Sequence, residues 1–374
     1  MEKYDANGKV VFIEPRWITG ETCLFTVNNK IQHAYAKGKL SKMRKEFVEK
    51  LENEGFIITD NKNYNEEDVI TFVMNNNAIT ESEDIAYFKK EFDKVIFDLG
   101  GEKLNFPKTL TMKEYLEKPF FPAVMKNEIM NGGYDKFLIE TEEQLEIIKK
   151  FYNEYDDQEL FDCTVFQQFI ETPTNYKTYM RVLMSSSGEV MGASLKYSEA
   201  YTKAREPKGT YEQHFWNPNS KYFMECKGMF NYYSGGGNIY FPQPKYSTMS
   251  KRILAAHNID PENPAIPEEV LEVSKNIAIK GNKTLGVICG IDFIYNEKDN
   301  KWYYLEIQAF PAIDEWAVTK GIKIPKIKSV DDYIKLLELE LIPRHEALIN
   351  HAKMLDKKYE EVPKKYELKQ QGDN

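Results

Sequence analysis

Two acidic side chains, Asp292 and Glu306, stand in the middle of two apolar segments. The segments GVICGIDFIYN and WYYLEIQAF are rich in β-branched and aromatic residues, which favours strands, and the polar stretch EKDNK between them predicts a turn. A hairpin centred near Asp299 would place Asp292 directly opposite Glu306. Because like charges directly opposite each other destabilise a sheet, a positive group is expected between them.

A divalent cation is the obvious candidate for this positive group. Gln308 lies two residues after Glu306, so it shares the same face of its strand and adds a neutral amide oxygen. Two carboxylates and one amide form an oxygen-only ligand set, which suits Mg²⁺ with phosphate oxygens completing its shell. The competing interpretation is a pair of exposed acids on the wet face of an ordinary hairpin.

A lysine followed by two glycines forms a second group. In AVMKNEIMNGGYDKF, Lys126 ends a predicted strand, and Gly132 and Gly133 follow in a loop. An ammonium and unobstructed backbone N–H groups can surround phosphates. The P-loop pattern is absent, however, and a plain turn beside a surface lysine is the alternative. The next apolar segment, TVFQQFIE, can offer backbone groups to an adenine edge or can be a simple core strand.

Two cations, Arg181 and Lys196, lie on adjacent strands of a predicted hairpin that turns at Ser187–Gly188. Side chains placed in this way can clamp a polyphosphate. Further along the chain, Asn231 precedes three successive glycines, which can let a substrate or a phosphate approach the backbone closely. A flexible loop is the competing interpretation of the glycines.

These groups need a scaffold, and the sequence predicts one of the α/β class. Segments 9–15, 55–60 and 68–74 are predicted strands, and a helix with Met43, Phe47 and Leu51 on one face connects the first two. This alternation predicts a parallel sheet with helical crossovers. Another helix is predicted from about 82 to 99, and TEEQ at Thr141 is a capping box that opens a third helix.

Bulk composition narrows the class of partner. The chain has 374 residues, 42% hydrophobic and 29% charged, with a net charge of −9, which argues against nucleic acid or an anionic membrane as the main partner. The polar start is no signal peptide, and four scattered cysteines without a C-x-x-C pair favour the reducing cytoplasm. None of the five histidines has the spacing of a triad or a metal site.

The order of the motifs resembles that of the ATP-grasp superfamily, over roughly Lys94 to Asp314. Members carry a lysine before a P-x-T segment, then P-x-V-x-K with a glycine-rich loop and a capped helix. A hinge strand, a basic strand, and an Asp with a later E-x-N follow. The matching stretches here are FDKVIF…FPKT, FPAVMKNEIMNGGYDKF, TVFQQFIE, YMRVL…SLKYS, GIDF and LEIQAFP.

The resemblance implies that ATP is held between two α+β subdomains, with Mg²⁺ bridging its β- and γ-phosphates. One or two ions are expected, and Mn²⁺ can substitute. The implied roles are nucleotide binding for Lys94 (or its neighbour Lys90), Lys126, Gly132, Gly133, Gln167, Gln168, Phe169 and Ile170, phosphate and substrate binding for Arg181, Lys196 and Asn231, and metal binding for Asp292, Glu306 and Gln308.

The resemblance also implies a domain plan. It places an N-terminal Rossmann-like domain with a parallel sheet at 1–118 and a central lid subdomain at 119–172. A mainly antiparallel C-terminal subdomain follows at 173–345, with an insertion at about 200–243, and a charged helix and tail occupy 346–374.

The implied activity is that of an ATP-dependent carboxylate–amine ligase, which works through an acyl phosphate and releases ADP and phosphate. Its substrates would be a small-molecule or peptide carboxylate and an amine, and a homodimer is expected because many relatives are dimers. The superfamily usually has Asn where this chain has Gln308, one methylene longer. Two alternatives stay open: a kinase on the same fold, and a nucleotide-binding regulatory protein without turnover, which Gln308 favours.

Overall fold

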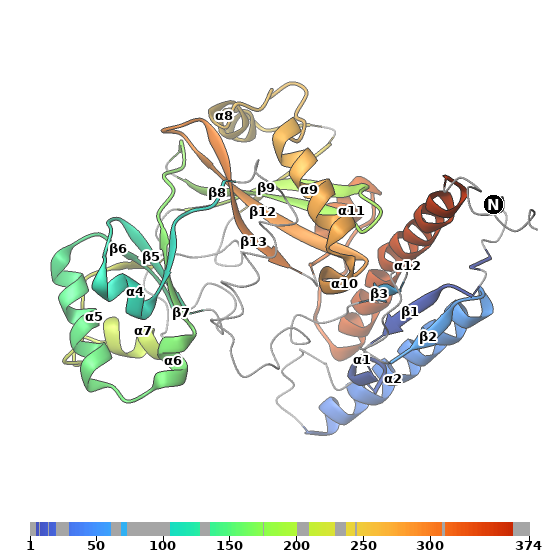
Figure 1. Cartoon of the computed structure of the whole chain (residues 1–374), viewed down its shortest axis with the longest axis horizontal. Helices are drawn as coiled ribbons and strands as arrows, with labels where there is room; N and C mark the ends of the chain where they lie inside the picture. Colours follow the sequence, from blue (N-terminus) through green and yellow to red (C-terminus); the bar gives the residue numbers. More distant parts are fainter. Residues whose placement is uncertain are drawn as a thin grey trace, which may run out of the picture.

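The computed structural model describes residues 5–6, 8–13, 15–19, 30–60, 69–72, 105–127, 135–174, 176–199, 209–228, 237–243, 245–308 and 311–361. Within these ranges the chain forms one three-stranded and two five-stranded sheets. In Figure 1 the five-stranded sheet from the C-terminal part of the chain lies between the three-stranded N-terminal sheet and the other five-stranded sheet. The predicted helix at 82–99 lies outside the described residues.

The N-terminal sheet is parallel, as the alternation of strands and helices predicts. Strands β1 (Val10–Ile13), β2 (Ile57–Thr59) and β3 (Ile70–Phe72) pair in the order β2-β1-β3. Helix α1 (Pro15–Thr19) follows β1, and α2 (Lys30–Asn53) then leads to β2. The predicted apolar face of α2 is confirmed, because Phe47 and Leu51 are buried against β1 and β3.

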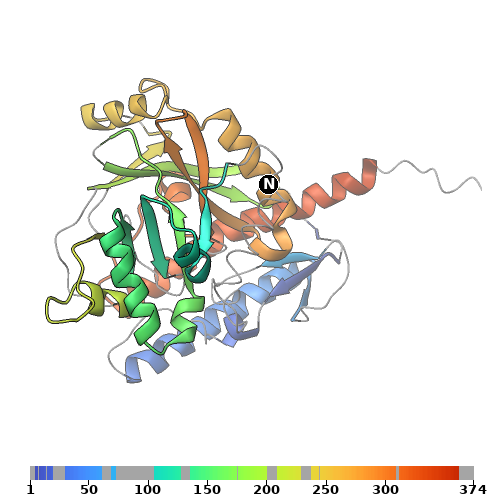
Figure 2. The same ribbon diagram turned by 60° about the vertical axis from the view of Figure 1, so that its left-hand side comes forward.

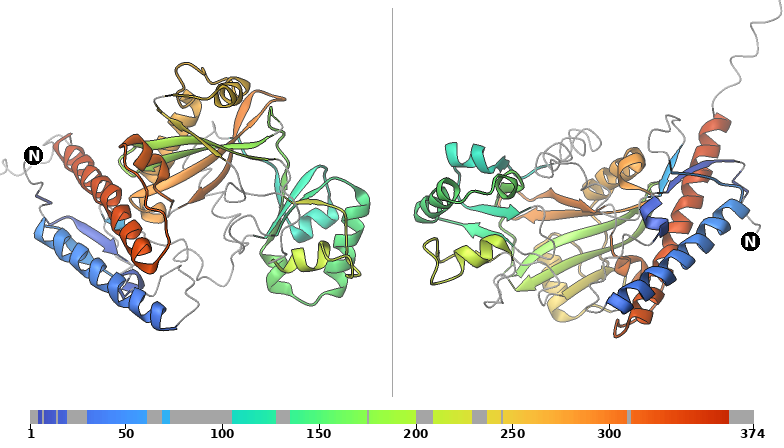
Figure 3. Two further views of the ribbon diagram at one scale, coloured as in Figure 1. Left: turned by 180° about the vertical axis from the view of Figure 1, so that it is seen from behind. Right: turned by 90° about the horizontal axis from the view of Figure 1, so that it is seen from below.

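The long C-terminal helix completes this N-terminal unit. Helix α12 (Val330–Glu361) begins well before the predicted position 346 and runs beside α2 (Figure 3). Its apolar residues Leu341, Leu348 and Leu355 join Phe47 and Leu51 in one core. Segments from opposite ends of the chain therefore share a single hydrophobic cluster.

The central unit, defined as residues 109–168 and 209–228, is built on an antiparallel sheet, seen in front in Figure 2. The capping box at Thr141 is confirmed, since its side chain accepts from the N–H of Gln144 and the Gln144 side chain accepts from the N–H of Thr141. The elements are β4 (Thr109–Thr111), α4 (Met112–Glu117), β5 (Ala123–Asn127), β6 (Lys136–Ile139), α5 (Glu142–Glu154), α6 (Gln158–Asp162), β7 (Thr164–Gln168), α7 (Thr210–Phe215) and β10 (Lys227–Gly228), with strand order β10-β6-β5-β7-β4.

Part of the predicted insertion packs in the central unit rather than beside the strands that flank it in sequence. Tyr211 and Phe215 of α7 place their rings 5.6 and 5.3 Å from the ring of Phe151 on α5. β10 then adds a strand beside β6. The aromatic residues of this segment are buried there against the apolar residues of α5 and of the central sheet.

The C-terminal unit, residues 176–199 and 237–319, carries an antiparallel sheet in the order β11-β9-β8-β12-β13. The predicted hairpin at Ser187–Gly188 is confirmed, and Gly188 has a φ of 83°, which suits glycine. The elements are β8 (Tyr176–Ser185), β9 (Val190–Glu199), β11 (Gly237–Phe241), α8 (Thr248–Ala256), α9 (Glu268–Lys280), α10 (Asn282–Leu285), β12 (Ile288–Asn296), β13 (Lys301–Gln308) and α11 (Asp314–Thr319).

The parallel N-terminal sheet, the two antiparallel sheets and their covering helices confirm the predicted α/β class. In the part of the chain that the structure describes, no helix is long and apolar enough to cross a membrane.

A close approach between β9 and α11 leads to a first prediction. A Cβ on Gly192 would lie 2.5 Å from the backbone carbonyl carbon of Glu315, and backbone cannot swing away as a side chain can. We expect Gly192→Ala to lower the free energy of unfolding by about 1–3 kcal/mol through overpacking. Urea unfolding measures this loss. Gly38→Ala is the control, because Gly38 lies within α2 with open space around it, so the change should stabilise by roughly 0.5–1 kcal/mol. Equal stability of Gly192→Ala and wild type would show that the contact is looser.

Candidate nucleotide and metal site

The two acids of the β12–β13 hairpin lie opposite each other, as predicted. Asp292 pairs with Glu306, and Gln308 pairs with Gly290 on the same register. Between Asp292 and the turn the register shifts by one residue at a bulge, so Phe293 pairs with Tyr304. A β-bulge changes the direction in which the neighbouring side chains point. The predicted register therefore applies at the acid pair and fails nearer the turn.

The positive group beside Asp292 is a side chain of the neighbouring strand. Arg181 of β8 pairs with Asp292 in the sheet, and its Nε and Nη2 donate to the two carboxylate oxygens at 2.7 and 2.6 Å. Both side chains are buried, with exposed fractions of 3% and 0%. Burial raises the pKa of Asp292, and the charge and hydrogen bonds of Arg181 oppose that rise.

A row of polar residues crosses four strands at this level. Ser194 of β9, Arg181 of β8, Asp292 of β12 and Glu306 of β13 are successive partners across the sheet, so they share one face. Lys196 stands two residues from Ser194 on the same face. The predicted cationic pair of Arg181 and Lys196 is thus part of one polar stripe.

Lys196 has a carboxylate partner of its own in this stripe. Its Nζ lies 3.0 Å from Oε1 of Glu315 in α11, and the hydroxyl of Ser194 donates to the same oxygen at 2.7 Å. Lys196 and Glu315 are both almost fully buried. The second oxygen of Glu315, Oε2, is buried without a hydrogen-bond partner.

A cavity of about 120 Å³ lies between the central sheet and the C-terminal sheet. The predicted site residues that line it come from three separate segments: Lys126, Gln167, Gln168, Phe169, Ile170 and Glu306. Lys126 is buried and donates to the side-chain oxygen of Gln167. Val124 and Leu305 add apolar walls from the two facing sheets, which suits a flat ring. We call this the inner cavity.

Lys177 also lines the inner cavity, and sequence reasoning missed it. Its Nζ lies 4.0 Å from the centre of the Phe169 ring, which is a cation–π contact. Burial lowers the pKa of Lys177 to about 8. Lys177, Tyr179 and Arg181 are two residues apart along β8, so all three lie on one face of the strand. This spacing in the sequence could have indicated that Lys177 faces the same side as Arg181.

The remaining predicted residues divide into two groups. Gln308 follows Glu306 on the same face of β13 and is half-buried, beyond the residues that line the inner cavity. Lys90, Lys94, Gly132, Gly133 and Asn231 lie outside the described residues.

The donor set near Glu306 fits a hard divalent cation. Among the described residues no group of three or more His, Cys, Asp or Glu side chains is arranged for a metal. Asp292, Glu306 and Gln308 nevertheless offer only oxygen ligands on one sheet face, the chemistry that Mg²⁺ prefers. An ionised carboxylate has about four lone-pair sites, so the two bonds from Arg181 leave Asp292 able to bind a metal as well.

Comparisons with known proteins were made for the sequence and for the structure. The sequence matches no protein-family model and no curated protein. Similar solved structures include the ATP-grasp ligase PsnB complexed with a minimal precursor, at 13% identity and a TM-score of 0.37 over 88% of this chain and 78% of that one. A second is the Chryseobacterium gregarium RiPP-associated ATP-grasp ligase in complex with ADP and a leader and core peptide, at 12% identity and 0.37 over 93% and 77%. A third is the L-amino acid ligase from Bacillus licheniformis, at 15% identity and 0.33 over 82% and 61%.

Proposed function

We propose that the chain is an ATP-dependent carboxylate–amine ligase that forms an amide bond through an acyl phosphate. The observation that supports it best is the inner cavity. Lys126, the hinge residues Gln167 to Ile170, and Glu306 are far apart in sequence and converge on it. Convergence of a buried cation, an apolar slot and a carboxylate on one cavity suits a magnesium nucleotide.

Each group has a role that its chemistry suits. Lys126 would bind the α- and β-phosphates, and the backbone at Phe169 and Ile170 would pair with the base edge. Asp292, Glu306 and Gln308 would hold Mg²⁺, which neutralises phosphate charge when it is bound. Arg181 and Lys196 would orient the transferring phosphate and the substrate carboxylate.

The proposed reaction has two steps. An oxygen of the substrate carboxylate attacks the γ-phosphorus, the bond to the β–γ bridging oxygen breaks, and ADP leaves. The amine nitrogen then attacks the acyl carbon and phosphate leaves with the electron pair, while the amine loses a proton to solvent. Catalysis here consists mainly of positioning and charge neutralisation, so no nucleophilic Ser or Cys is needed. Release of AMP instead of ADP in a substrate screen would contradict this mechanism.

The proposed substrates are a small-molecule or peptide carboxylate and an amine, and we propose that the protein works in the cytoplasm as a homodimer.

A nucleotide-binding protein without turnover is the second candidate. It is favoured by Gln308 in place of Asn, and by the two hydrogen bonds that occupy Asp292. It would bind ATP but would release no ADP with any carboxylate and amine. A kinase on the same site would instead give a stable phosphorylated product without a second substrate.

Thermal melting tests the nucleotide site directly. At about 100 times its Kd, Mg-ATP should stabilise the wild-type protein by roughly 2.7 kcal/mol, which raises Tm by a few degrees. Glu306→Gln should lose the part of this shift that depends on Mg²⁺, because it removes a charged ligand. Glu297→Gln, at an exposed position in the turn of the same hairpin, should keep the whole shift. If ATP shifts neither the wild type nor the control, the proposed function is wrong.

A further inference from the structure

A second and larger cavity, which we call the outer cavity, lies at the hinge end of the central sheet. Its volume is about 890 Å³, within the range of small-molecule sites. It shares Gln168, Phe169 and Lys177 with the inner cavity, whereas Lys126 and Glu306 line the inner cavity alone. The outer cavity is therefore adjacent to the proposed nucleotide site and does not contain its phosphate end.

Aromatic rings that carry lysines form much of its wall. The Nζ of Lys108 lies 4.6 Å from the centre of the Phe120 ring, and that of Lys177 lies 4.0 Å from the centre of the Phe169 ring. Rings and ammonium groups side by side suit a ligand with a flat apolar body and a negative charge. Here the rings and the ammonium groups line a concave cavity, whereas on an ordinary solvated surface they would lie on a convex face.

The charges around the outer cavity favour an anion. Its two glutamates are both paired: Glu171 with Lys298 at 2.9 Å, and Glu140 with Lys227 at 3.0 Å. With Lys108 and Lys177, three lysines line the cavity against two glutamates, and Lys227 neutralises Glu140 from outside the lining. An incoming anion therefore meets a local excess of positive charge.

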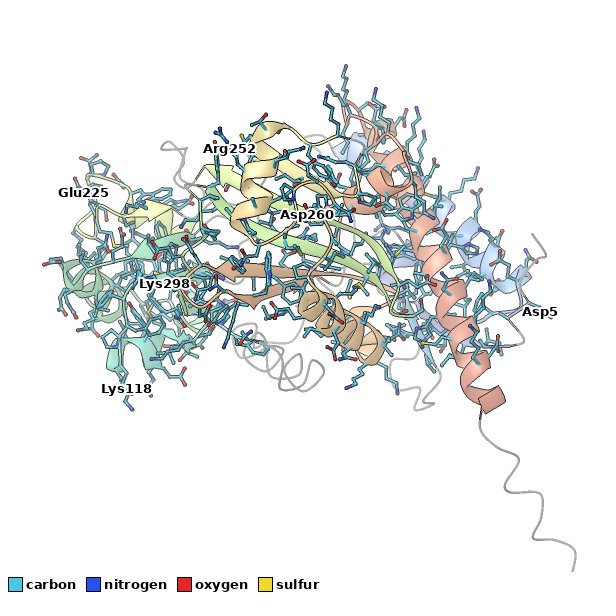
Figure 4. All side chains as sticks on the ribbon, turned by 90° about the horizontal axis from the view of Figure 1, so that it is seen from above. Asp5, Lys118, Glu225, Arg252, Asp260 and Lys298 are labelled. Carbon is cyan, nitrogen blue, oxygen red and sulfur yellow. The ribbon has the colours of Figure 1, made fainter. Side chains whose placement is uncertain are left out.

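The cavity is formed by both units that flank the hinge. Lys108 is tied to the central sheet, since the N–H of Gln168 donates to its carbonyl at 2.7 Å. Lys177 is the second residue of β8 in the C-terminal sheet, and Lys298 lies in the turn of the β12–β13 hairpin, at the end of that hairpin next to the central unit (Figure 4). A ligand that contacts these lysines would bridge the central and C-terminal units.

We propose that the outer cavity is a second ligand site, which binds a small aromatic anion between the central and C-terminal units. This site adjoins the proposed nucleotide site and shares Gln168, Phe169 and Lys177 with it, but neither Lys126 nor Glu306 lines it. Because Phe169 and Lys177 line both cavities, the two ligands would each affect the affinity for the other.

Lys177 makes this binding dependent on pH. Burial lowers its pKa to about 8; Glu171 and Glu140 raise that pKa, and Lys227 lowers it further. The ammonium is present below this pKa and is lost above it. A bound anion stabilises the ammonium and raises the pKa. Affinity for the anion should therefore be higher at pH 7 than at pH 9.5.

Calorimetric titration of the full chain with 2-naphthalenesulfonate tests the proposal, with and without saturating Mg-ADP. We expect one site per chain, kept in Mg-ADP, and weaker binding at pH 9.5. The neutral body, 2-naphthol, should bind far less. Lys108→Gln should weaken the sulfonate about 10-fold or more, because it removes a charged contact. Lys301→Gln, at an exposed position in the same hairpin as Lys298, should bind like wild type.

Three results would overturn the second site. They are no heat of binding, equal affinity of wild type and Lys108→Gln, and loss of binding when Mg-ADP is added, which would place the sulfonate in the nucleotide site. Failure of Mg-ADP to bind would contradict the proposed function but would leave the sulfonate titration interpretable. The melting temperature of ligand-free Lys108→Gln checks that the variant is folded.

Discussion

Replacing Arg181 with methionine is expected to lower the free energy of unfolding by about 3–5 kcal/mol. Asp292 is fully buried, and Arg181 donates a hydrogen bond to each of its two carboxylate oxygens. Removing the guanidinium would leave a carboxylate in the core of a sheet with its main partner gone. Urea unfolding followed by tryptophan fluorescence measures the loss, since Trp302 and Trp316 lie in the same unit.

The double variant Arg181→Met, Asp292→Leu separates the ion pair from simple packing. Replacing both members of a buried pair by apolar groups is often neutral, so the double variant should recover most of the loss. The surface control is Lys251→Met, which breaks the exposed pair of Lys251 and Glu262 and should cost at most about 1 kcal/mol. If Arg181→Met is as stable as this control, Asp292 does not depend on Arg181.

Replacing Lys126 with methionine is expected to weaken binding of Mg-ADP by about 30-fold to several thousand-fold. Truncating one member of a buried charge pair typically costs about 2–5 kcal/mol, and each 1.4 kcal/mol is tenfold in Kd. Lys126 is 7% exposed and lines the inner cavity, so a phosphate bound there would lose its enclosed cation. Calorimetric titration with Mg-ADP gives the two dissociation constants.

Lys149→Met is the matched control for this change. Lys149 is a half-buried lysine on α5 of the same central unit, and it pairs with Glu146 on the surface. Its replacement should leave the Kd for Mg-ADP unchanged. The ligand-free melting temperature of Lys126→Met should stay close to that of wild type, because methionine fills similar space. Unchanged affinity in Lys126→Met would remove this lysine from the proposed nucleotide site.

Local pattern was enough to predict several parts of the structure. The capping box at Thr141 needs only residues three apart, and the hairpin at Ser187–Gly188 needs only a turn between two apolar runs. The pairing of Asp292 with Glu306 was likewise predicted, because a hairpin fixes partners by their distance from the turn. The bulge after Asp292 was not predicted, since no residue in that stretch specifies it.

Parts of the candidate site depend on contacts between distant segments, and the sequence alone did not indicate them. Lys177 was missed because a lone lysine at the start of a strand is usually solvated, and only the approach of two sheets encloses it. The return of 209–228 to the central unit was missed for a similar reason. Its aromatic residues are buried against α5, which is more than 50 positions away.

By itself, the sequence determined the class of fold, the opposed acids of one hairpin, and the residue types that we propose bind a magnesium nucleotide. These follow from short periods and turns, which act over neighbouring residues. Only the tertiary structure decided that Arg181 meets Asp292, and that Lys126, Phe169 and Glu306 line one cavity. Arg181 and Asp292 are 111 positions apart, and they meet because β8 and β12 pair in one sheet. Local periodicity does not specify which distant strands become neighbours, since that choice depends on how the whole chain buries its apolar surface.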